Sequence, residues 1–171
     1  TGYSGGGKKL IAAYEAASAE QRERLRGPRP YALGLQHKHL PEMRAIVGLE
    51  FLPFFEPVVG DFYKGMLVSL PLLTRLLPKK VTPHDVHEVL AAHYQGERFV
   101  VVQPLDASSL LEDGYLNPIA CNDTNRLELF VFGHDEQILI VARLDNLGKG
   151  ASGAAVQCLN LMLGVDEGTA L

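Results

Sequence analysis

Two histidines separated by one residue are the sharpest chemical feature of the sequence. His37 and His39 lie in a run that ends with Pro41 and Glu42. Residues 31–39 are predicted to be extended chain, in which residues two apart share a face, so both imidazoles would point the same way. Imidazole titrates near neutral pH and is a common general acid or base. In one interpretation one imidazole transfers a proton, while Glu42 holds the other or fixes its tautomer.

Two further interpretations of this pair remain open. The two imidazoles and Glu42 all carry metal-ligand atoms, but no other His, Cys or Asp is spaced to complete a set, so metal binding is the least favoured. A purely structural pair is the other alternative. The remaining histidines are expected to be solvated or structural; they are His84, His87, His93 and His134.

A glycine-rich loop at the start of the sequence is a candidate anion site. It brings backbone N–H groups, a hydroxyl and an ammonium to the beginning of a helix, where unpaired amides and the helix dipole favour a phosphate or carboxylate. Its residues are Ser4, Gly5, Gly6, Gly7 and Lys8. The spacing of a nucleotide P-loop and its preceding strand are absent. A flexible glycine turn is the alternative interpretation.

A second run of small residues, 145–151, follows a predicted strand and opens the last helix. Small side chains allow a ligand or another backbone to approach closely, so a cofactor contact is predicted here. The polar loop 122–125 is expected to be a scaffold that forms turns. Neither cysteine is a convincing nucleophile: Cys158 is predicted to lie among apolar helix residues, whereas Cys121 lies in a polar loop with only Arg126 nearby.

The composition excludes several classes of protein. With 47% apolar and 21% charged residues among 171, the chain is long enough for one domain with a real core, and it is not a disordered or coiled-coil sequence. A net charge of -4 and the absence of basic runs exclude a nucleic-acid partner. No apolar run reaches the roughly 18 residues of a membrane helix. Two cysteines favour a reducing cytoplasm. Because the chain opens at Thr1 within a glycine-rich loop, it is expected to be part of a longer protein.

The elements that position these residues indicate an α+β domain with an antiparallel or mixed sheet and helices packed on it. No internal boundary or repeat is evident. Helices are predicted at 8–24, from Pro41 onward, from an N-cap at Thr82 to a stop at Gly96, and at 149–163. Strands are predicted at 54–59, 62–77 with a kink near Pro71, 98–103, 127–132 and 137–144. Hairpin turns are predicted at 60–61 and 133–136.

The last predicted helix is apolar nearly all round. Between residues 151 and 163 its only polar side chains are Ser152, Gln157 and Asn160, and these do not share a face. A helix of this kind should be buried on every side. Cover from another domain or subunit is therefore expected, and burial inside this domain is the alternative.

Four segments together resemble one enzyme family, N-acetyl-γ-glutamyl-phosphate reductase, the arginine-biosynthetic relative of aspartate-semialdehyde dehydrogenase. The segments are residues 2–8, 37–42, 57–66 and 145–157, and their order matches from end to end. The loop 122–125 is similar to that of the shorter of the two sequence types in the family. The resemblance implies a fold like the C-terminal domain of glyceraldehyde-3-phosphate and semialdehyde dehydrogenases.

The resemblance also implies a division of labour within a longer protein. Residues 1–171 would form the substrate-binding and dimerisation domain, preceded by an NAD(P)-binding domain and a nucleophilic cysteine that this chain does not contain. The family's thiolate attacks the acyl phosphate, phosphate leaves, and NADPH reduces the thioester to the semialdehyde. The implied partners are N-acetylglutamyl phosphate, NADP(H) bound mainly by the missing domain, and further copies in a dimer or tetramer. The last helix would return to the nucleotide domain.

By this resemblance each candidate residue receives a role. His39 is predicted to be the acid/base, with His37 as the second choice and Glu42 as the orienting partner. Ser4, Gly5, Gly6, Gly7 and Lys8 match the family's substrate loop, although the family usually has Arg where Lys8 stands, which argues against a bidentate anion contact. The predicted cofactor contacts are Asn146, Lys149, Gly150 and Ala151. No metal is expected.

Two alternative functions remain open. One is a related acyl-phosphate reductase of aspartate or aminoadipate metabolism, since the sequence does not fix acyl-chain selectivity. The other is a non-catalytic oligomerisation module with a structural histidine pair. Under the leading hypothesis this chain alone is inactive, because the thiol and the nucleotide fold lie outside it.

Overall fold

The chain divides into two compact units, Thr1–Tyr63 and Lys64–Leu171, in a computed structural model that describes residues 1–171. The sequence indicated no such boundary. The first unit contains α1 (Gly7–Glu15), α2 (Ala19–Leu25), β1 (Arg29–Pro30), α3 (Leu40–Val47) and β2 (Val58–Val59). The second contains β3 (Met66–Leu73), α4 (Pro83–His93), β4 (Val100–Val102), β5 (Leu127–His134), β6 (Gln137–Leu144), a π-helical turn (Gly148–Ser152) and α5 (Gly153–Leu163).

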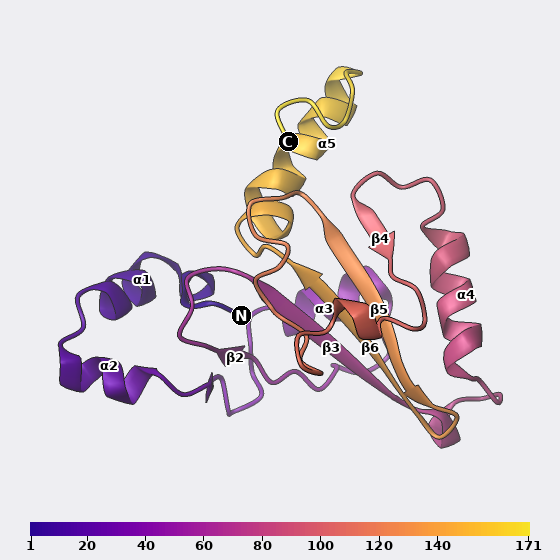
Figure 1. The fold of residues 1–171 in the computed structure, drawn as a ribbon, viewed down its shortest axis with the longest axis horizontal. Helices are drawn as coiled ribbons and strands as arrows, with labels where there is room; N and C mark the ends of the chain where they lie inside the picture. Colours follow the sequence, from indigo (N-terminus) through magenta and orange to yellow (C-terminus); the bar gives the residue numbers. More distant parts are fainter. The chain divides into compact units, whose positions relative to one another are not determined.

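The predicted α+β class is confirmed by helices that accompany a mixed sheet (Figure 1). The main sheet has the strand order β3-β6-β5-β4; β4 is parallel to β5 and the other pairs are antiparallel. The hairpin of β5 and β6 was predicted correctly, with a tighter turn than expected because β5 continues to His134. Pro71 is tolerated in β3 because β3 is an edge strand.

The single helix predicted at 8–24 is wrong, because the chain forms two helices there. α1 ends at Glu15, and Ser18 then starts α2 with a capping box: its side chain accepts the Gln21 N–H at 3.3 Å, and the Gln21 side chain accepts the Ser18 N–H at 2.8 Å. A local cap of this kind satisfies helix N–H groups that would otherwise lack partners, so it competes with helix continuation.

The hairpin predicted across Gly60 and Asp61 is also wrong. β2 pairs with β1, and β3 pairs along its whole length with β6, from Met66 opposite Leu144 to Leu73 opposite Gln137. The Gly60 N–H donates instead to the carbonyl of Thr1 at 2.9 Å. Long-range pairing therefore determines the strand partners, whereas local turn chemistry suggested a neighbour.

Phe130 is the centre of the main core and has no exposed surface. It packs with Val141, its partner across β5 and β6, and with Ala107 from the preceding loop. Leu67, Leu116 and Phe132 complete the cluster. This face of the sheet is closed by the long loop between β4 and β5, which the sequence predicted only as a polar connection.

A buried ion pair lies on the same two strands. Glu128 and Arg143 face one another in register, and Arg143 donates from Nε and Nη2 to Glu128 Oε2 at 2.8 and 2.5 Å. Gln103 donates to the other carboxylate oxygen at 2.8 Å, and the Cys121 thiol donates to Oε2 at 3.3 Å. Arg126 lies 2.8 Å from Oε1 at the edge of the pair. Every oxygen of the buried carboxylate is therefore satisfied.

α4 begins at the predicted cap, with a reciprocal capping box between Thr82 and Asp85. It packs against β4 and β5. His87, which was expected to be solvated, is half-buried instead, and its Nε2 lies 3.0 Å from the carbonyl oxygen of Gln103. The contact exists because α4 turns this residue toward the sheet rather than toward water.

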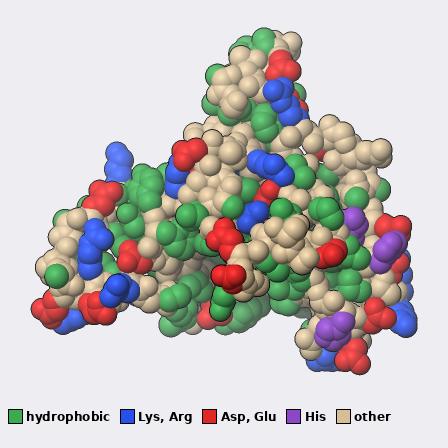
Figure 2. All heavy atoms as spheres, in the orientation of Figure 1, with side chains coloured by type: hydrophobic (Ala, Val, Ile, Leu, Met, Phe, Trp, Pro, Cys, Tyr) green, Lys and Arg blue, Asp and Glu red, His purple; other side chains and the backbone are tan.

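α5 is not buried inside its own unit, so that alternative is wrong. Leu161, Met162 and Leu163 are 59%, 84% and 66% exposed. The helix projects beyond the end of the sheet to which it is joined, and Figure 2 shows hydrophobic side chains on this segment (Figures 1 and 2). The buried residues of α5 are Gly153 and Asn160, and Asn160 donates to the Glu167 and Thr169 carbonyls of the tail. No helix of the structure has the length and apolarity needed to span a bilayer.

Candidate functional site

The glycine-rich loop forms a 3₁₀ turn, Tyr3–Gly6, that leads directly into α1. The N–H groups of Tyr3 and Ser4 donate to the carbonyls of Phe62 and Tyr63 at 2.8 and 3.0 Å. These amides are therefore used to hold the loop in place. An anion at this loop would be bound through the exposed first turn of α1, which contains Lys8, rather than through the N–H groups of Tyr3 and Ser4.

Two of the glycines are required by geometry. A Cβ at Gly6 would lie 2.7 Å from Cβ of Leu10, and Gly7 has φ of +72°, which favours glycine. The conformation of the loop therefore depends on glycine at these two positions.

A stack of aromatic rings holds the glycine-rich loop in place, and the sequence analysis did not predict it. Tyr3 stacks on Tyr14 with ring centroids 4.4 Å apart, and Tyr63 packs edge-on against Tyr3 at 5.6 Å. Arg29 donates to the Tyr14 hydroxyl at 2.8 Å and lies over its ring. The available signal was the tyrosine within the glycine motif itself, since a large ring there needs a partner.

The histidine pair is brought together as expected, but by a turn rather than by extended chain. The N–H of His39 donates to Nδ1 of His37 at 3.2 Å, and the two rings lie 4.7 Å apart. His39 is the N-cap of α3 and has helical dihedral angles instead of the extended ones usual for an N-cap. The Leu40 N–H donates to the His37 carbonyl. No hydrogen bond or ring contact joins this pair to the glycine-rich loop.

The two rings differ in environment. His37 is half-buried and packs edge-on against Tyr31 and Phe55 at 5.9 and 5.1 Å. Burial, followed by the nearby charges of His39 and Lys38, lowers the pKa of His37 below its usual value. Because Nδ1 accepts a hydrogen bond, the neutral ring carries its proton on Nε2. His39 is exposed and so is open to a ligand.

Glu42 is exposed in the first turn of α3, and no hydrogen bond or ion pair joins it to either imidazole. The structure therefore places it next to the pair in sequence but not in contact with it. No group of three or more His, Cys, Asp or Glu side chains in residues 1–171 is arranged to hold a metal ion.

A prediction follows from the His37 geometry. In the folded protein the His37 ring should be neutral at pH 7, with its proton on Nε2 and a titration midpoint below 6.5. The unfolded chain takes up this proton at a higher pH than the folded protein does. His37 should therefore lower the free energy of unfolding progressively as pH falls from 6.5 to the folded midpoint, and below that midpoint the loss should stay constant. NMR of the ring nitrogens measures both quantities, with His37→Gln to assign the signal. A proton on Nδ1, or a midpoint above 6.5, would contradict the geometry.

The predicted cofactor turn belongs to the second unit and is closely packed at its base. A Cβ at Gly148 would lie 2.9 Å from the carbonyl oxygen of Thr124, and one at Gly153 would lie 2.3 Å from Oδ1 of Asn125. Gly148 therefore admits the backbone of the loop at Thr124, and Gly153 admits the side chain of Asn125. Gly150 and Ala151 remain exposed and present no bulky side chain.

Side chains around this turn form a connected network. The Lys149 ammonium donates to Gln157 Oε1 at 2.6 Å and lies 5.6 Å from the centroid of the Phe99 ring. Asn125 donates to the same Gln157 oxygen, and Gln157 donates to Glu167. Lys149 is thus held beside α5 rather than extended into solvent.

The two cysteines have the opposite environments to those expected from the sequence, which placed Cys158 among apolar residues and Cys121 in a polar loop. Cys121 is buried, and burial together with the neighbouring Glu128 raises the pKa of its thiol to about 11. Cys158 is exposed on α5 because that helix is uncovered. Cys121 is therefore no nucleophile at neutral pH.

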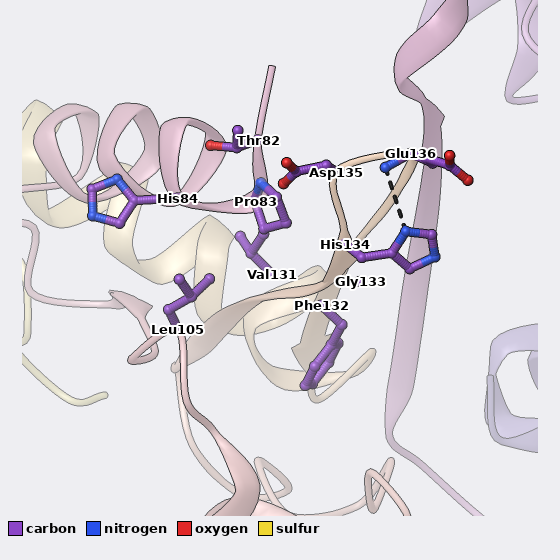
Figure 3. Close-up of a pocket in the computed structure, with 10 residues that line it drawn as sticks. All are labelled: Thr82, Pro83, His84, Leu105, Val131, Phe132, Gly133, His134, Asp135 and Glu136. Atoms are coloured by element: carbon purple, nitrogen blue, oxygen red, sulfur yellow. Dashed lines mark hydrogen bonds between the residues drawn. The ribbon is translucent and has the colours of Figure 1, made fainter. Parts of the chain in front are cut away.

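A cleft of about 810 Å³ lies between the start of α4 and the β5–β6 turn, and it contains none of the predicted site residues (Figure 3). Leu105 and Val131 contribute apolar surface, and Asp135 lies at its edge. His84 and His134 lie on opposite sides of the residues that line the cleft (Figure 3).

Comparison with known proteins decides the family. The family model described as semialdehyde dehydrogenase, dimerisation domain, matches residues 1–146. The chain belongs to this family. Residues 1–146 include the glycine-rich loop, the histidine pair and the main sheet, so the dimerisation domain of the semialdehyde dehydrogenases accounts for most of both units.

Three curated relatives of this semialdehyde dehydrogenase domain carry the name of one enzyme. The chain is 50% identical to N-acetyl-γ-glutamyl-phosphate reductase 2 of Nostoc sp. and 49% identical to the N-acetyl-γ-glutamyl-phosphate reductase of Trichormus variabilis. It is 46% identical to that of Burkholderia cenocepacia. Each match covers 98% of this chain and 53% of the relative. The chain thus spans about half the length of the curated relatives it matches.

Proposed function

We propose that this chain is the substrate-binding and dimerisation part of an N-acetyl-γ-glutamyl-phosphate reductase. The reaction is the NADPH-dependent reduction of N-acetylglutamyl 5-phosphate to N-acetylglutamate 5-semialdehyde and phosphate, in arginine biosynthesis. The observation that carries the proposal is 50% identity over nearly the whole chain to a protein of that name. The names of the relatives favour this substrate over the aspartate and aminoadipate alternatives, and they disfavour a non-catalytic module.

The geometry of the histidine pair supports different roles for its two rings. We assign the acid/base role to His39, which is exposed at the start of α3. It would give a proton to the oxygen that gains charge when the carbonyl group is reduced. His37 would remain neutral and orient the pair, since its Nδ1 accepts the His39 N–H. Glu42 stays a predicted orienting partner that would have to approach the pair when substrate binds.

The glycine-rich loop is the proposed binding site for the substrate's anionic groups. Within this loop, the geometry favours anion binding at the exposed first turn of α1, where the ammonium of Lys8 lies. Gly5, Gly6 and Gly7 allow the substrate to approach the backbone, and Ser4 anchors the loop from its buried position. Because Lys8 is a point charge, the contact would be less directional than one made by arginine.

The turn before α5 is the proposed contact for the cofactor. Exposed Gly150 and Ala151 leave room for a flat ring, and the ammonium of Lys149 matches a phosphorylated nucleotide in charge. These features fit NADP(H), whose bound nicotinamide would supply the hydride. Asn146, which accepts the Gly65 N–H at 2.8 Å, would orient the ring from the start of the turn.

The rest of the protein would provide what this chain lacks. We propose that a preceding NAD(P)-binding domain contributes the nucleophilic cysteine and covers the exposed apolar side chains of α5. The whole protein would act as a dimer or tetramer in the cytoplasm. The family description supports self-association, and the exposed apolar surface supports a missing domain.

The proposal is tested with the full-length natural protein. In the oxidative direction, N-acetylglutamate semialdehyde, inorganic phosphate and NADP should yield NADPH, and omission of phosphate should abolish the signal. Residues 1–171 alone should give no turnover. Faster oxidation of aspartate semialdehyde would indicate the related reductase, and inactivity with every semialdehyde would favour the non-catalytic module.

A further inference from the structure

Asp145 is the least exposed charged residue of the chain, at 1%, and the roles considered above do not use it. It follows β6 directly and precedes the proposed cofactor turn. Its Oδ1 accepts the Leu147 N–H at 2.8 Å, and its Oδ2 accepts the Asp123 N–H at 2.9 Å. The Lys64 ammonium lies 3.3 Å from Oδ2. One carboxylate therefore binds groups from three separate segments of the second unit.

Neighbouring side chains strengthen the same junction. Asn146 accepts the Gly65 N–H at 2.8 Å, and Asn122 donates to the Lys64 carbonyl at 2.9 Å. The Lys64 ammonium also pairs with Asp123, whose side chain is 81% exposed. Lys64 and Gly65 are therefore bound on both backbone and side chain by the two loops that Asp145 connects.

The junction leaves no room for adjustment. Gly65 has φ of +116°, and a Cβ there would lie 2.6 Å from the carbonyl oxygen of Pro118. A Cβ at Gly148 would lie 3.3 Å from Cβ of Asp145. Close-packed backbone of this kind transmits a displacement instead of absorbing it.

The carboxylate is charged at neutral pH. Burial by itself would raise the pKa of Asp145, but the N–H groups of Asp123, Leu147 and Gly148, together with Lys64, hold it below its usual value. The backbone carbonyl of Asp145 also accepts the Gly150 N–H at 2.8 Å. Side chain and main chain of one residue thus determine the path of the turn up to Gly150.

We infer that Asp145 is a positioning residue that fixes the turn 146–151 and thereby orients Asn146 and Lys149 toward the nicotinamide nucleotide. The inference rests on the proposed function, because it assumes that this turn contacts the cofactor. Asp145 touches neither substrate nor cofactor in this role. Its effect should therefore appear in cofactor binding before it appears in any chemical step.

The test uses the full-length enzyme and Asp145→Asn, which keeps the size of the side chain but replaces one acceptor oxygen by an amide. We expect the KM for NADP to rise about tenfold or more, because small displacements of positioning groups have effects of this order. The KM for N-acetylglutamate semialdehyde should change less than twofold. Asp135→Asn is the matched control: it makes the same substitution at an exposed aspartate of the β5–β6 turn, outside the junction, and should leave both KM values unchanged.

Three outcomes separate the possibilities. An unchanged KM for NADP in a folded Asp145→Asn enzyme would overturn this inference while leaving the proposed function intact. If the unsubstituted enzyme oxidises no semialdehyde, the proposed function fails first. If Asp145→Asn does not fold, Lys64→Met removes the opposite side of the junction and should raise the same KM selectively; equal changes in both KM values would contradict the assignment.

Discussion

Replacing His39 by alanine in the full-length enzyme should lower kcat by about 10²- to 10⁴-fold, since a positioned general acid or base contributes that much to a rate. The side chain is exposed at the N-terminus of α3 and makes no hydrogen bond that the fold needs, so the thermal midpoint should stay the same. Steady-state kinetics with purified protein, together with thermal unfolding, measure both quantities.

His93→Ala is the matched control for this experiment. His93 is also an exposed histidine at a helix end, in the last turn of α4, and it has no part in the proposed site. Its replacement should leave kcat within twofold of the unsubstituted enzyme. An unchanged kcat for His39→Ala would instead support a structural histidine pair and a non-catalytic module.

Replacing Arg143 by leucine should destabilise the fold by about 3–5 kcal/mol, because removal of one partner leaves an uncompensated buried charge on Glu128. The pair lies in register on the two central strands, with both side chains less than a tenth exposed. Arg126 reaches the other carboxylate oxygen from the edge, and it should recover only part of the lost stabilisation. Urea unfolding of the full-length protein, followed by circular dichroism, gives the free energy of unfolding.

The double variant Glu128→Leu with Arg143→Leu separates charge from packing. Removing both partners also removes the desolvation penalty, so the double variant should be more stable than Arg143→Leu alone. If the double variant is instead the less stable of the two, Glu128 stabilises the fold mainly through its other partners, which are Gln103, Cys121 and Arg126.

Local signals in the sequence were sufficient wherever the structure depends on neighbouring residues. The capping box at Thr82, the hairpin of β5 and β6, and the helix that starts near Pro41 are all present as predicted. Each depends on groups only a few residues apart, whose chemistry is visible in the sequence. The capping box at Ser18 is of the same kind and was overlooked, because the apolar periodicity of 8–24 continues through it.

The pairing of strands that are far apart in the chain could not be predicted from the sequence. Nothing near residues 66–73 reveals that β6 is their partner, and the glycine at position 60 suggested a closer one. The Glu128–Arg143 pair was missed for a similar reason, since charged residues in a strand normally indicate a solvated face. For the candidate site, the sequence identified the histidines and glycines, whereas the rings of Tyr14 and Phe55 that support them come from distant positions.

The strand order has a consequence for synthesis of the protein. β6 is the last strand to leave the ribosome, yet it is the partner of both β3 and β5. The backbone of β3 must therefore wait for most of the second unit to be translated before it can pair, and non-local pairings of this type form slowly. During that interval the nascent chain is a natural substrate for chaperones, and any pause in translation before residue 137 prolongs its exposure.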